Sequence, residues 1–283
     1  MKCVNIIMIN VQDEYRGLLS GVLYGGTAKE DRTETGTLSV FGRVLRHNME
    51  LGFPLLTTKK IYFNNAITEL LWILQGRTDM QYLIDNGVNY WTPDYERSGR
   101  TDGSLGKVYG YQWRNFNGVD QLFNLLVNIR KNPSSRRLMV NAWNPGDFDD
   151  MALPPCHYGF QVYINDGVMD LMWQQRSVDI FLGLPYDIAM YGLLLQMLAK
   201  GNGYKAGQLI GQLGDCHIYN NHLEQAETQL SRNFKELPNV DIDYGLKIQE
   251  GANNFIMIPT HNMIHLKNYN PHGPIKAKLN VGK

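Results

Sequence analysis

The chain has 283 residues, of which 43% are hydrophobic, so it can bury a sizeable core. Its 27 lysines and arginines balance its 27 aspartates and glutamates, which argues against the global basic field of a dedicated nucleic-acid binder. Its cysteines (Cys3, Cys156 and Cys216) lie far apart without a CxxC pair, so they predict neither a zinc site nor a disulfide framework and fit a reducing cytoplasm. Polar residues interrupt the apolar run Val4 to Ile9, so we expect neither a signal peptide nor a membrane span.

Apolar periodicity and turn residues predict one α+β domain covering residues 1–283, without linkers or repeats. Residues 87–104 form the least regular stretch and are expected to be exposed and mobile. The last fifty or so residues predict two or three strands and a tail. Helices are expected at about 12–24, 63–74, 119–129, 188–200 and 221–230, and strands at about 38–49, 138–143, 158–164, 168–175 and 209–214.

The stretch Leu153-Pro154-Pro155-Cys156-His157 places a thiol at a rigid corner. Two successive prolines fix φ and remove two backbone donors, so neither a helix nor a central strand continues through them. The thiolate is the nucleophilic form, so cationic neighbours are needed to lower a starting pKa of about 8.5. Arg176, at the end of the second strand that follows, is one such neighbour. Cys156 is therefore either a nucleophile or a buried small hydrophobe.

Three polar loops carry arginines: 31–37, 134–137 and 175–179. A guanidinium grips phosphate bidentately, so these loops can form a phosphate site, although each can also be an ordinary solvated connection. Glu69 lies within the apolar stripe of the helix at 63–74. A buried carboxylate is costly unless it is paired, so Glu69 is either bonded to a cation or catalytic.

Seven motifs, in order along nearly the whole chain, resemble those of the thymidylate synthase family. The resemblance implies a mixed β-sheet packed with helices and a homodimer joined sheet to sheet. It also implies a pyrimidine deoxynucleoside monophosphate as substrate and 5,10-methylenetetrahydrofolate as co-substrate, with no metal. The motifs are Asp31-Arg32-Thr33, Glu69-Leu70-Leu71-Trp72, Ser135-Arg136-Arg137, Pro154-Pro155-Cys156-His157, Gln175-Arg176-Ser177, Gly183-Leu184-Pro185 and His217-Ile218-Tyr219.

By this resemblance, Cys156 is the nucleophile that adds to C6 of the pyrimidine, while Glu69 and His157 manage water and protons. C5 of a pyrimidine is not nucleophilic until a thiolate saturates C6, so covalent catalysis replaces one hard step by easier ones. The nucleotide is then expected on Arg32, Gln175, Arg176, Ser177, Asp179, His217 and Tyr219, with Arg136 and Arg137 reaching in from the partner subunit. The folate is expected on Tyr90, Trp91, Asp179, Leu182, Gly183 and Tyr186, with Lys59 at its glutamate tail. The four arginines would also supply the positive field that Cys156 needs.

Uracil-specific members of the family carry Asn where this chain has Asp187. A carboxylate only accepts hydrogen bonds, so it meets O4 of uracil without a proton between them, whereas it can accept from the 4-amino group and a protonated N3 of cytosine. Such a mismatch costs about 1–3 kcal/mol. The alternative is that Asp187 is the N-cap of the following helix, where Asp and Asn serve about equally well. We expect Asp187 to select the base and dCMP to be the substrate.

Two further departures concern the step after carbon transfer. The end of the chain, 278–283, is longer and more polar than the apolar tail that closes the family's synthases, and Asp94-Tyr95 follows Trp91 in place of a second tryptophan. Excluding water protects a reactive intermediate, so a leakier site lets water rather than hydride quench the exocyclic methylene at C5. We therefore expect a dCMP hydroxymethylase, an activity of this family known from bacteriophages, in the cytoplasm or in the host cytoplasm if phage-encoded.

Three rival activities remain open. A dCMP methylase would give 5-methyl-dCMP and dihydrofolate, and a thymidylate synthase would act on dUMP. A catalytically silent nucleotide- or RNA-binding relative is the non-enzymatic alternative, which the presence of Cys156 and of all four arginines disfavours. Neither a membrane nor a nucleic acid is expected as a partner.

Overall fold

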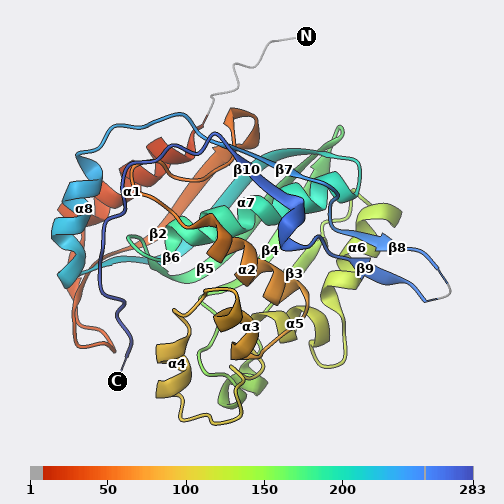
Figure 1. Ribbon diagram of the computed structural model, residues 1–283, viewed down its shortest axis with the longest axis horizontal. Helices are drawn as coiled ribbons and strands as arrows, with labels where there is room; N and C mark the ends of the chain where they lie inside the picture. Colours follow the sequence, from red (N-terminus) through yellow and green to blue (C-terminus); the bar gives the residue numbers. More distant parts are fainter. Residues whose placement is uncertain (1–8, 252, 283) are drawn as a thin grey trace.

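A six-stranded mixed sheet runs through the centre of the fold (Figure 1). The computed structural model describes residues 9–251 and 253–282, so Cys3 and nearly all of the run Val4 to Ile9 lie outside the described residues. The strand order is β1-β2-β6-β5-β4-β3, in which β5 and β6 run parallel and the other neighbours run antiparallel. The strands are β1 (Thr27–Lys29), β2 (Thr37–Asn48), β3 (Met139–Asn141), β4 (His157–Asn165), β5 (Val168–Asp179) and β6 (Lys205–Tyr219).

Helix α7 (Leu184–Gly201) connects the parallel strands β5 and β6. Two parallel strands need such a long crossover, because the chain must return from the end of the first strand to the start of the second. The helix packs against β5 and β6 on one side and against α2 (Phe63–Leu74) on the other. Most of its residues are buried for this reason, which explains why its sequence is apolar almost all round.

The other helices surround the sheet and α7 (Figure 1). Helix α1 packs against β2, β6 and α8, and α5 packs against α2 and α6. Four short 3₁₀ turns complete the helical part of the described chain. The remaining helices are α1 (Val11–Gly25), α3 (Met80–Asp85), α4 (Thr92–Arg97), α5 (Tyr109–Asn115), α6 (Gln121–Lys131) and α8 (Leu223–Leu230), and the 3₁₀ turns are Met49–Leu51, Pro145–Asp150, Asn220–His222 and His261–Met263.

The central strands are longer than their sequence pattern predicts. β6 has 15 residues and β5 continues to Asp179, whereas the apolar alternation predicts only 209–214 and 168–175. β6 lies between β2 and β5, so backbone pairing on both sides extends it through residues whose side chains give no strand signal. Beyond α8, the described chain forms four short strands in two separate two-stranded sheets, more than the two or three expected. These pairs are β7 (Asn239–Ile242) with β10 (Ile264–Lys267), and β8 (Lys247–Gln249) with β9 (Phe255–Met257).

Residues 87–104 contain a helix and more side-chain hydrogen bonds than the sequence predicts. Helix α4 lies within them, and the guanidinium of Arg97 donates to Asp94 Oδ1 and to the carbonyl of Ala152, each at 3.1 Å. Arg100 donates to Asp102 at 2.6 Å. Most of the stretch is buried or half-buried, so the expectation of an exposed loop is wrong for most of it. Composition alone does not reveal these side-chain bonds.

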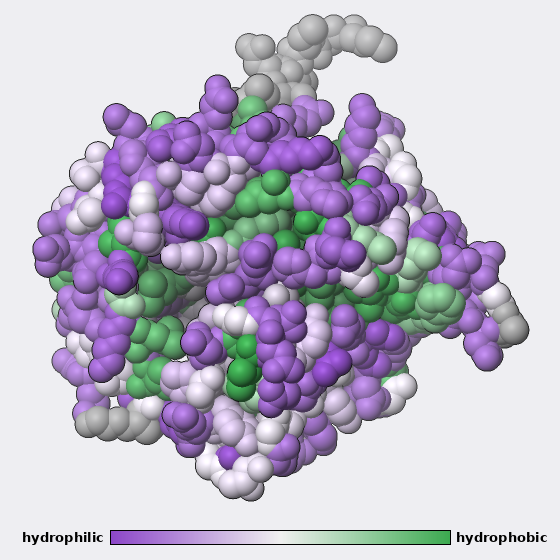
Figure 2. Space-filling view, viewed as in Figure 1, coloured by the Kyte–Doolittle hydropathy of each residue, from purple (hydrophilic) through white to green (hydrophobic). Residues whose placement is uncertain are grey.

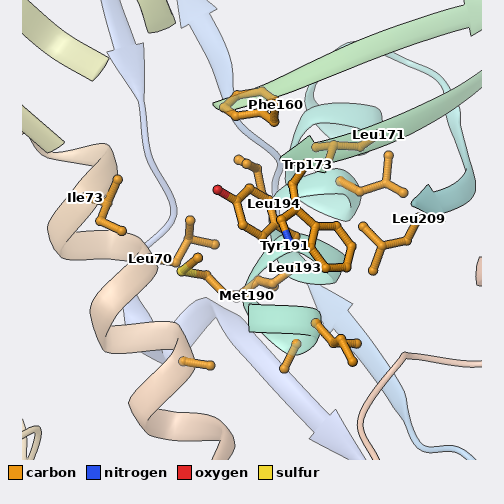
Figure 3. Close-up of a cluster of buried hydrophobic side chains, with 14 of the residues drawn as sticks. Leu70, Ile73, Phe160, Leu171, Trp173, Met190, Tyr191, Leu193, Leu194 and Leu209 are labelled. Carbon is orange, nitrogen blue, oxygen red and sulfur yellow. The ribbon is translucent and has the colours of Figure 1, made fainter. Parts of the chain in front are cut away.

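The core between the sheet and α7 is built around stacked aromatic rings. Figure 3 shows the rings of Trp173 and Tyr191 side by side, with centroids 5.3 Å apart and planes inclined by 7°. Trp173 lies opposite Gly211 on the neighbouring strand, and a Cβ at Gly211 would come within 2.6 Å of the indole. A glycine is therefore required beside this ring. Other members of this cluster are Leu70, Ile73, Phe160, Leu171, Met190, Leu193, Leu194 and Leu209.

The face seen in Figure 2 is mostly hydrophilic, with hydrophobic residues visible mainly in the gaps between polar ones. Within residues 9–251 and 253–282, no helix has both the length and the apolarity needed to cross a membrane.

We predict that Gly211→Ala destabilises the fold by about 1–3 kcal/mol, because the new methyl group overpacks against a ring that cannot move away. The midpoint of urea unfolding should fall accordingly. The control is Gly21→Ala on the exposed side of α1, where nothing lies within 4 Å of the added Cβ. That change should stabilise the protein by about 0.5–1 kcal/mol. An unchanged midpoint for Gly211→Ala would show that the indole is free to shift.

Candidate active site

The strand directions bring the predicted site residues to one end of the sheet. The carboxyl ends of parallel β5 and β6 meet there, and so do the amino ends of β2 and β4, which run the other way. The loops that precede β2 and β4 carry Arg32 and Cys156. Segments far apart in sequence are thereby gathered in one place (Figure 1). The register partners at this end are Asp179 and His217, His157 and Gln175, and Thr37 and Tyr219.

Cys156 is half-buried directly before β4. Burial raises the pKa of its thiol, while the positive charges of Arg176 and Arg32 oppose that rise. The carboxyls of Asp187 and Asp94 add to it. Within one chain, burial outweighs Arg176 and Arg32. The expectation that four arginines together lower the pKa of Cys156 stays a prediction, because Arg136 and Arg137 are expected from the partner subunit. The thiol is held protonated until a base or a change of surroundings removes the proton.

Arg176 fixes the proline corner in front of the thiol. Its Nε and one terminal nitrogen donate to the carbonyls of Pro155 and Pro154, each at 2.9 Å, and its backbone N–H donates to the carbonyl of Cys156. The guanidinium lies 5.4 Å from the ring centroid of Trp143. A guanidinium has five N–H donors, so the remaining ones are available for an anion.

His157 is buried between two tyrosines. Its ring stacks on Tyr109 at 4.3 Å, and its Nδ1 lies 2.9 Å from the hydroxyl of Tyr191. Burial lowers the pKa of His157 to about 3, so the imidazole is neutral at physiological pH. A neutral imidazole has one donor and one acceptor nitrogen, so it can relay a proton but does not store positive charge.

Glu69 projects from α2 and is hydrogen-bonded by two aromatic side chains. Its carboxylate accepts from the hydroxyl of Tyr90 at 2.6 Å and from the indole N–H of Trp91 at 2.7 Å. Burial raises the pKa of Glu69, although these two bonds oppose the rise. Tyr90 and Trp91 therefore orient the proposed proton-transfer group as well as lining the site.

Asp187 lies in the first turn of α7, whose N-cap is Gly183, so the alternative interpretation of Asp187 as the N-cap is wrong. Its Oδ2 accepts from the side-chain amide of Gln175 at 2.8 Å. Burial raises the pKa of Asp187 to about 7, and the charges of Glu69 and Asp179 add to the rise. The carboxyl is thus about half protonated near neutral pH and can donate as well as accept.

Asp179 shapes the turn between β5 and α7. Its Oδ1 accepts from the backbone N–H groups of Phe181 and Leu182, both at 3.0 Å. Its backbone carbonyl accepts from the backbone N–H of Gly183. Leu182 stays half-buried at the surface of this turn, and so does Tyr186, whose ring centroid lies 6.4 Å from that of Tyr90. The residues predicted to line a folate site are therefore neighbours here.

His217 and Tyr219 stand together at the end of β6, with ring centroids 5.2 Å apart. The Nδ1 of His217 lies 3.2 Å from the carbonyl of Asp215, whose register partner on β5 is Ser177. Burial raises the pKa of Tyr219 far above its usual range, so its hydroxyl stays protonated.

The loop that carries Arg32 meets the end of the described chain. The backbone of Gly282 lies so close to the guanidinium of Arg32 that a side chain at Gly282 would collide with it. Asn280 Oδ1 accepts from the hydroxyl of Thr35 at 3.3 Å and from the amide of Asn221 at 2.9 Å. The polar tail at 278–282 thus contacts the loop that carries Arg32. The polarity of the tail alone therefore does not leave this side of the site open to water.

Two groups of predicted residues differ from the rest: within the described chain, Arg136 and Arg137 make no contact with this cluster, and Lys59 is buried against the turn that carries Asp179. Arg136 and Arg137 are exposed before β3, and neither forms a hydrogen bond or ion pair with the site residues among the described part of the chain. Lys59 is 4% exposed, donates to the carbonyl of Phe181 and lies 3.7 Å from the centroid of its ring. Burial lowers the pKa of Lys59 to about 7. The exposed neighbour Lys60, and not Lys59, lines a cavity of about 690 Å³ beside residues 266–273.

The sequence does not predict several residues that contact the site residues. The hydroxyl of Tyr109 accepts from the backbone N–H of Cys156 at 2.9 Å, and Tyr191 contacts His157. Trp173 donates its indole N–H to Gln175 at 3.1 Å. The tyrosine inside the apolar run of α7 indicates such a contact in the sequence, because a buried hydroxyl needs a partner.

Within the described ranges, no group of three or more His, Cys, Asp or Glu side chains is placed to hold a metal ion.

Comparison with known proteins identifies the family of the chain. The family model described as thymidylate synthase matches residues 13–281. The thymidylate synthase of Mycoplasma mobile is 43% identical over 294 residues, which cover 95% of this chain and 100% of that protein. The chain therefore belongs to the thymidylate synthase family, whose enzymes transfer a one-carbon unit from methylenetetrahydrofolate to a nucleotide.

Proposed function

We propose that this enzyme acts on dCMP and that Asp187 selects the base. The observation that carries the proposal is the carboxyl of Asp187, held inside the site by Gln175 where uracil-specific members of the family have a carboxamide. Because the pKa of Asp187 is about 7, the carboxyl and the base can share one proton. N3 of cytosine is a basic ring nitrogen, whereas O4 of uracil is a weakly basic carbonyl, so the cytosine pair gains a charge-assisted hydrogen bond. The preference is graded, about tenfold, rather than absolute.

Cys156 adds to C6 of the base, which makes C5 nucleophilic. The folate, when bound, supplies the carbon that becomes attached to C5. Glu69 and neutral His157 move protons beside the base, and Arg32, Arg176 and Ser177 bind the phosphate. His217 and Tyr219 hold the 3′-hydroxyl of the deoxyribose, which two adjacent polar groups at the end of β6 can reach.

The product we propose is 5-hydroxymethyl-dCMP. One dCMP, one methylenetetrahydrofolate and one water give 5-hydroxymethyl-dCMP and tetrahydrofolate, so no reductant is consumed. The ion pair of Asp94 with Arg97 supports a hydroxymethyl product. Its charged groups lie near Cys156, because the charge of Asp94 raises the pKa of the thiol. Charged groups attract water, which is the group that must reach C5.

Thymidylate synthase activity on dUMP is the second candidate. It is favoured by the 43% identity to the thymidylate synthase of Mycoplasma mobile. A protonated Asp187 also weakens the argument from mismatch, since it can donate to O4 of uracil as a carboxamide does.

The chain offers suitable residues for the folate. A planar pterin ring with N–H donors fits the half-buried aromatic surfaces of Tyr90 and Tyr186, the apolar Leu182 and the carboxylate of Asp179. Trp91 is 93% buried and serves chiefly to hold Glu69. Gly183 lies between Asp179 and Asp187, and a Cβ there would contact the carbonyl of Asp179 at 3.3 Å.

We propose a homodimer formed through the sheet face that α7 leaves uncovered. Side chains alternate across a strand, so Val44, Met139 and Tyr163 point away from α7. One strand neighbour of each is buried, namely Leu45, Val140 and Val162. These three are 56%, 52% and 63% exposed. A second copy covering this face would also allow Arg136 and Arg137 to reach the partner's site.

We place the enzyme in the cytoplasm, or in the host cytoplasm if a bacteriophage encodes it. Cys156 and Cys216 are free thiols in the described residues, and a catalytic thiol must stay reduced to react. A reducing compartment maintains it in that form.

The first prediction from this proposed function concerns substrate and product. Purified protein given methylenetetrahydrofolate should show a kcat/KM for dCMP about tenfold above that for dUMP, and Asp187→Asn should reverse the order. Product mass and dihydrofolate absorbance are measured together.

A hydroxymethyl product from dCMP without dihydrofolate supports both parts of the proposal. Methylated dCMP with dihydrofolate keeps the choice of base and rejects quenching by water. Turnover of dUMP alone rejects both parts and leaves thymidylate synthase activity.

The second prediction concerns pH. In Cys156→Ser, which binds without reacting, dCMP should bind more weakly as pH rises through about 7, because the Asp187–base pair loses its shared proton. Between about pH 7 and pH 9 the Kd should rise by about tenfold or more. Isothermal titration calorimetry measures this, and adding Asp187→Asn should flatten the profile. An equally steep profile in the double variant would assign the proton to another group.

The third prediction tests the arginines across the dimer. Cys156→Ser and the double variant Arg136→Ala, Arg137→Ala should each be nearly inactive, but an equal mixture allowed to exchange subunits should recover about a quarter of parent activity. Mixed dimers then contain one site with an intact thiol and intact partner arginines. If mixing restores nothing, the arginines do not act across the interface.

A further inference from the structure

Trp173 lies behind the proposed base-selecting carboxyl, separated from it by one side chain. It is fully buried on β5, and its indole N–H donates to Oε1 of Gln175 at 3.1 Å. An indole can only donate, so this contact requires the oxygen, and not the nitrogen, of the Gln175 amide to face Trp173.

The other end of the Gln175 amide is thereby fixed. Its NH₂ group donates to Oδ2 of Asp187 at 2.8 Å and to the carbonyl of Ser177 at 3.1 Å. A flipped amide would place N–H against N–H at Trp173 and oxygen against oxygen at Asp187. All three hydrogen bonds would be lost together, and Gln175 is only 4% exposed, so water could not replace them.

Trp173 is itself unable to turn. One face of its ring stacks on Tyr191, as Figure 3 shows, and the backbone of Gly211 lies against its edge. The series of side-chain contacts from Tyr191 through Trp173 and Gln175 to Asp187 is therefore held in a single arrangement.

We propose that Trp173 is a positioning residue for base selection, which acts by fixing the Gln175 amide so that Oδ2 of Asp187 is the accepting oxygen of the carboxyl. The inference rests on the proposed function in one respect, namely that Asp187 faces the base. A carboxyl alone is symmetrical, because its proton can reside on either oxygen. With Oδ2 committed to accepting from Gln175, the proton is favoured on Oδ1, for which no hydrogen bond is seen to the described residues.

This commitment gives Asp187 the fixed order of donor and acceptor that a carboxamide has by its covalent structure. Cytosine presents a donor at position 4 and an acceptor at N3, and uracil presents the reverse. A carboxyl with a fixed order matches one base and not the other, whereas a carboxyl whose proton moves freely matches both. Trp173 therefore controls how strongly the site discriminates, whichever base it prefers.

The test is the ratio of kcat/KM values for dCMP and dUMP. Trp173→Phe keeps an aromatic ring and removes the N–H, and it should move the ratio about threefold to tenfold toward unity. The matched control is Trp72→Phe, which removes an indole bond to the carbonyl of Asp79 and should leave the ratio within about twofold of the parent value. A general loosening of the protein lowers turnover of both nucleotides together and does not change their ratio.

Gln175→Leu provides a second route, because it removes the amide itself and should lower discrimination in the same way if Trp173→Phe folds poorly. A parent enzyme that prefers dUMP contradicts the proposed function, but loss of that preference in Trp173→Phe still supports the role of Trp173. The inference is overturned if Trp173→Phe keeps the parent ratio, or if the parent enzyme itself does not discriminate.

Discussion

The parallel pairing of β5 with β6 is the constraint on which the site depends. It forces the chain to return through α7, and it places the carboxyl ends of both strands side by side, with Asp179 opposite His217. Because β2 and β4 run antiparallel to this pair, the loops that carry Arg32 and Cys156 arrive at the same end. The crossover helix then supplies Asp187 from its first turn. One strand pairing thus gathers the residues for which we propose the roles of nucleophile, anion binding and base contact.

Two half-buried carboxyls in the candidate site, Glu69 and Asp187, set its chemical character. Glu69 and Asp187 both have raised pKa values, chiefly because they are buried, and neither is paired with a cation in the described chain. They are instead oriented by neutral donors: Tyr90 and Trp91 for Glu69, and Gln175 for Asp187. Neutral donors fix direction without committing a carboxyl to its charged form. Such groups can gain and lose protons near neutral pH, which suits a reaction that moves protons on and off a base.

The sequence predicts the α+β class, the main helices and the central strands, because long apolar periodicities and proline or glycine boundaries are local signals. The thiol at the proline corner and the carboxylate in the apolar stripe are also visible, as residues whose chemistry does not suit their surroundings. The full length of β6 is not visible, since backbone pairing with two neighbours extends it through polar residues. The burial of Lys59 and the role of Trp173 depend on contacts 122 residues away in one case and on an amide orientation in the other. Neither leaves a local pattern.

The close approach of Trp173 to Gly211 has a consequence for redesign. The indole occupies the space that any side chain at Gly211 would need, so the two positions cannot be exchanged or transplanted separately. A related scaffold with a larger residue at the position of Gly211 could accept Asp187 by a single substitution, but it would have no room for the ring that orients Gln175. Transfer of this carboxyl to another scaffold therefore requires both strands to change together, and a screen of single substitutions would miss the combination.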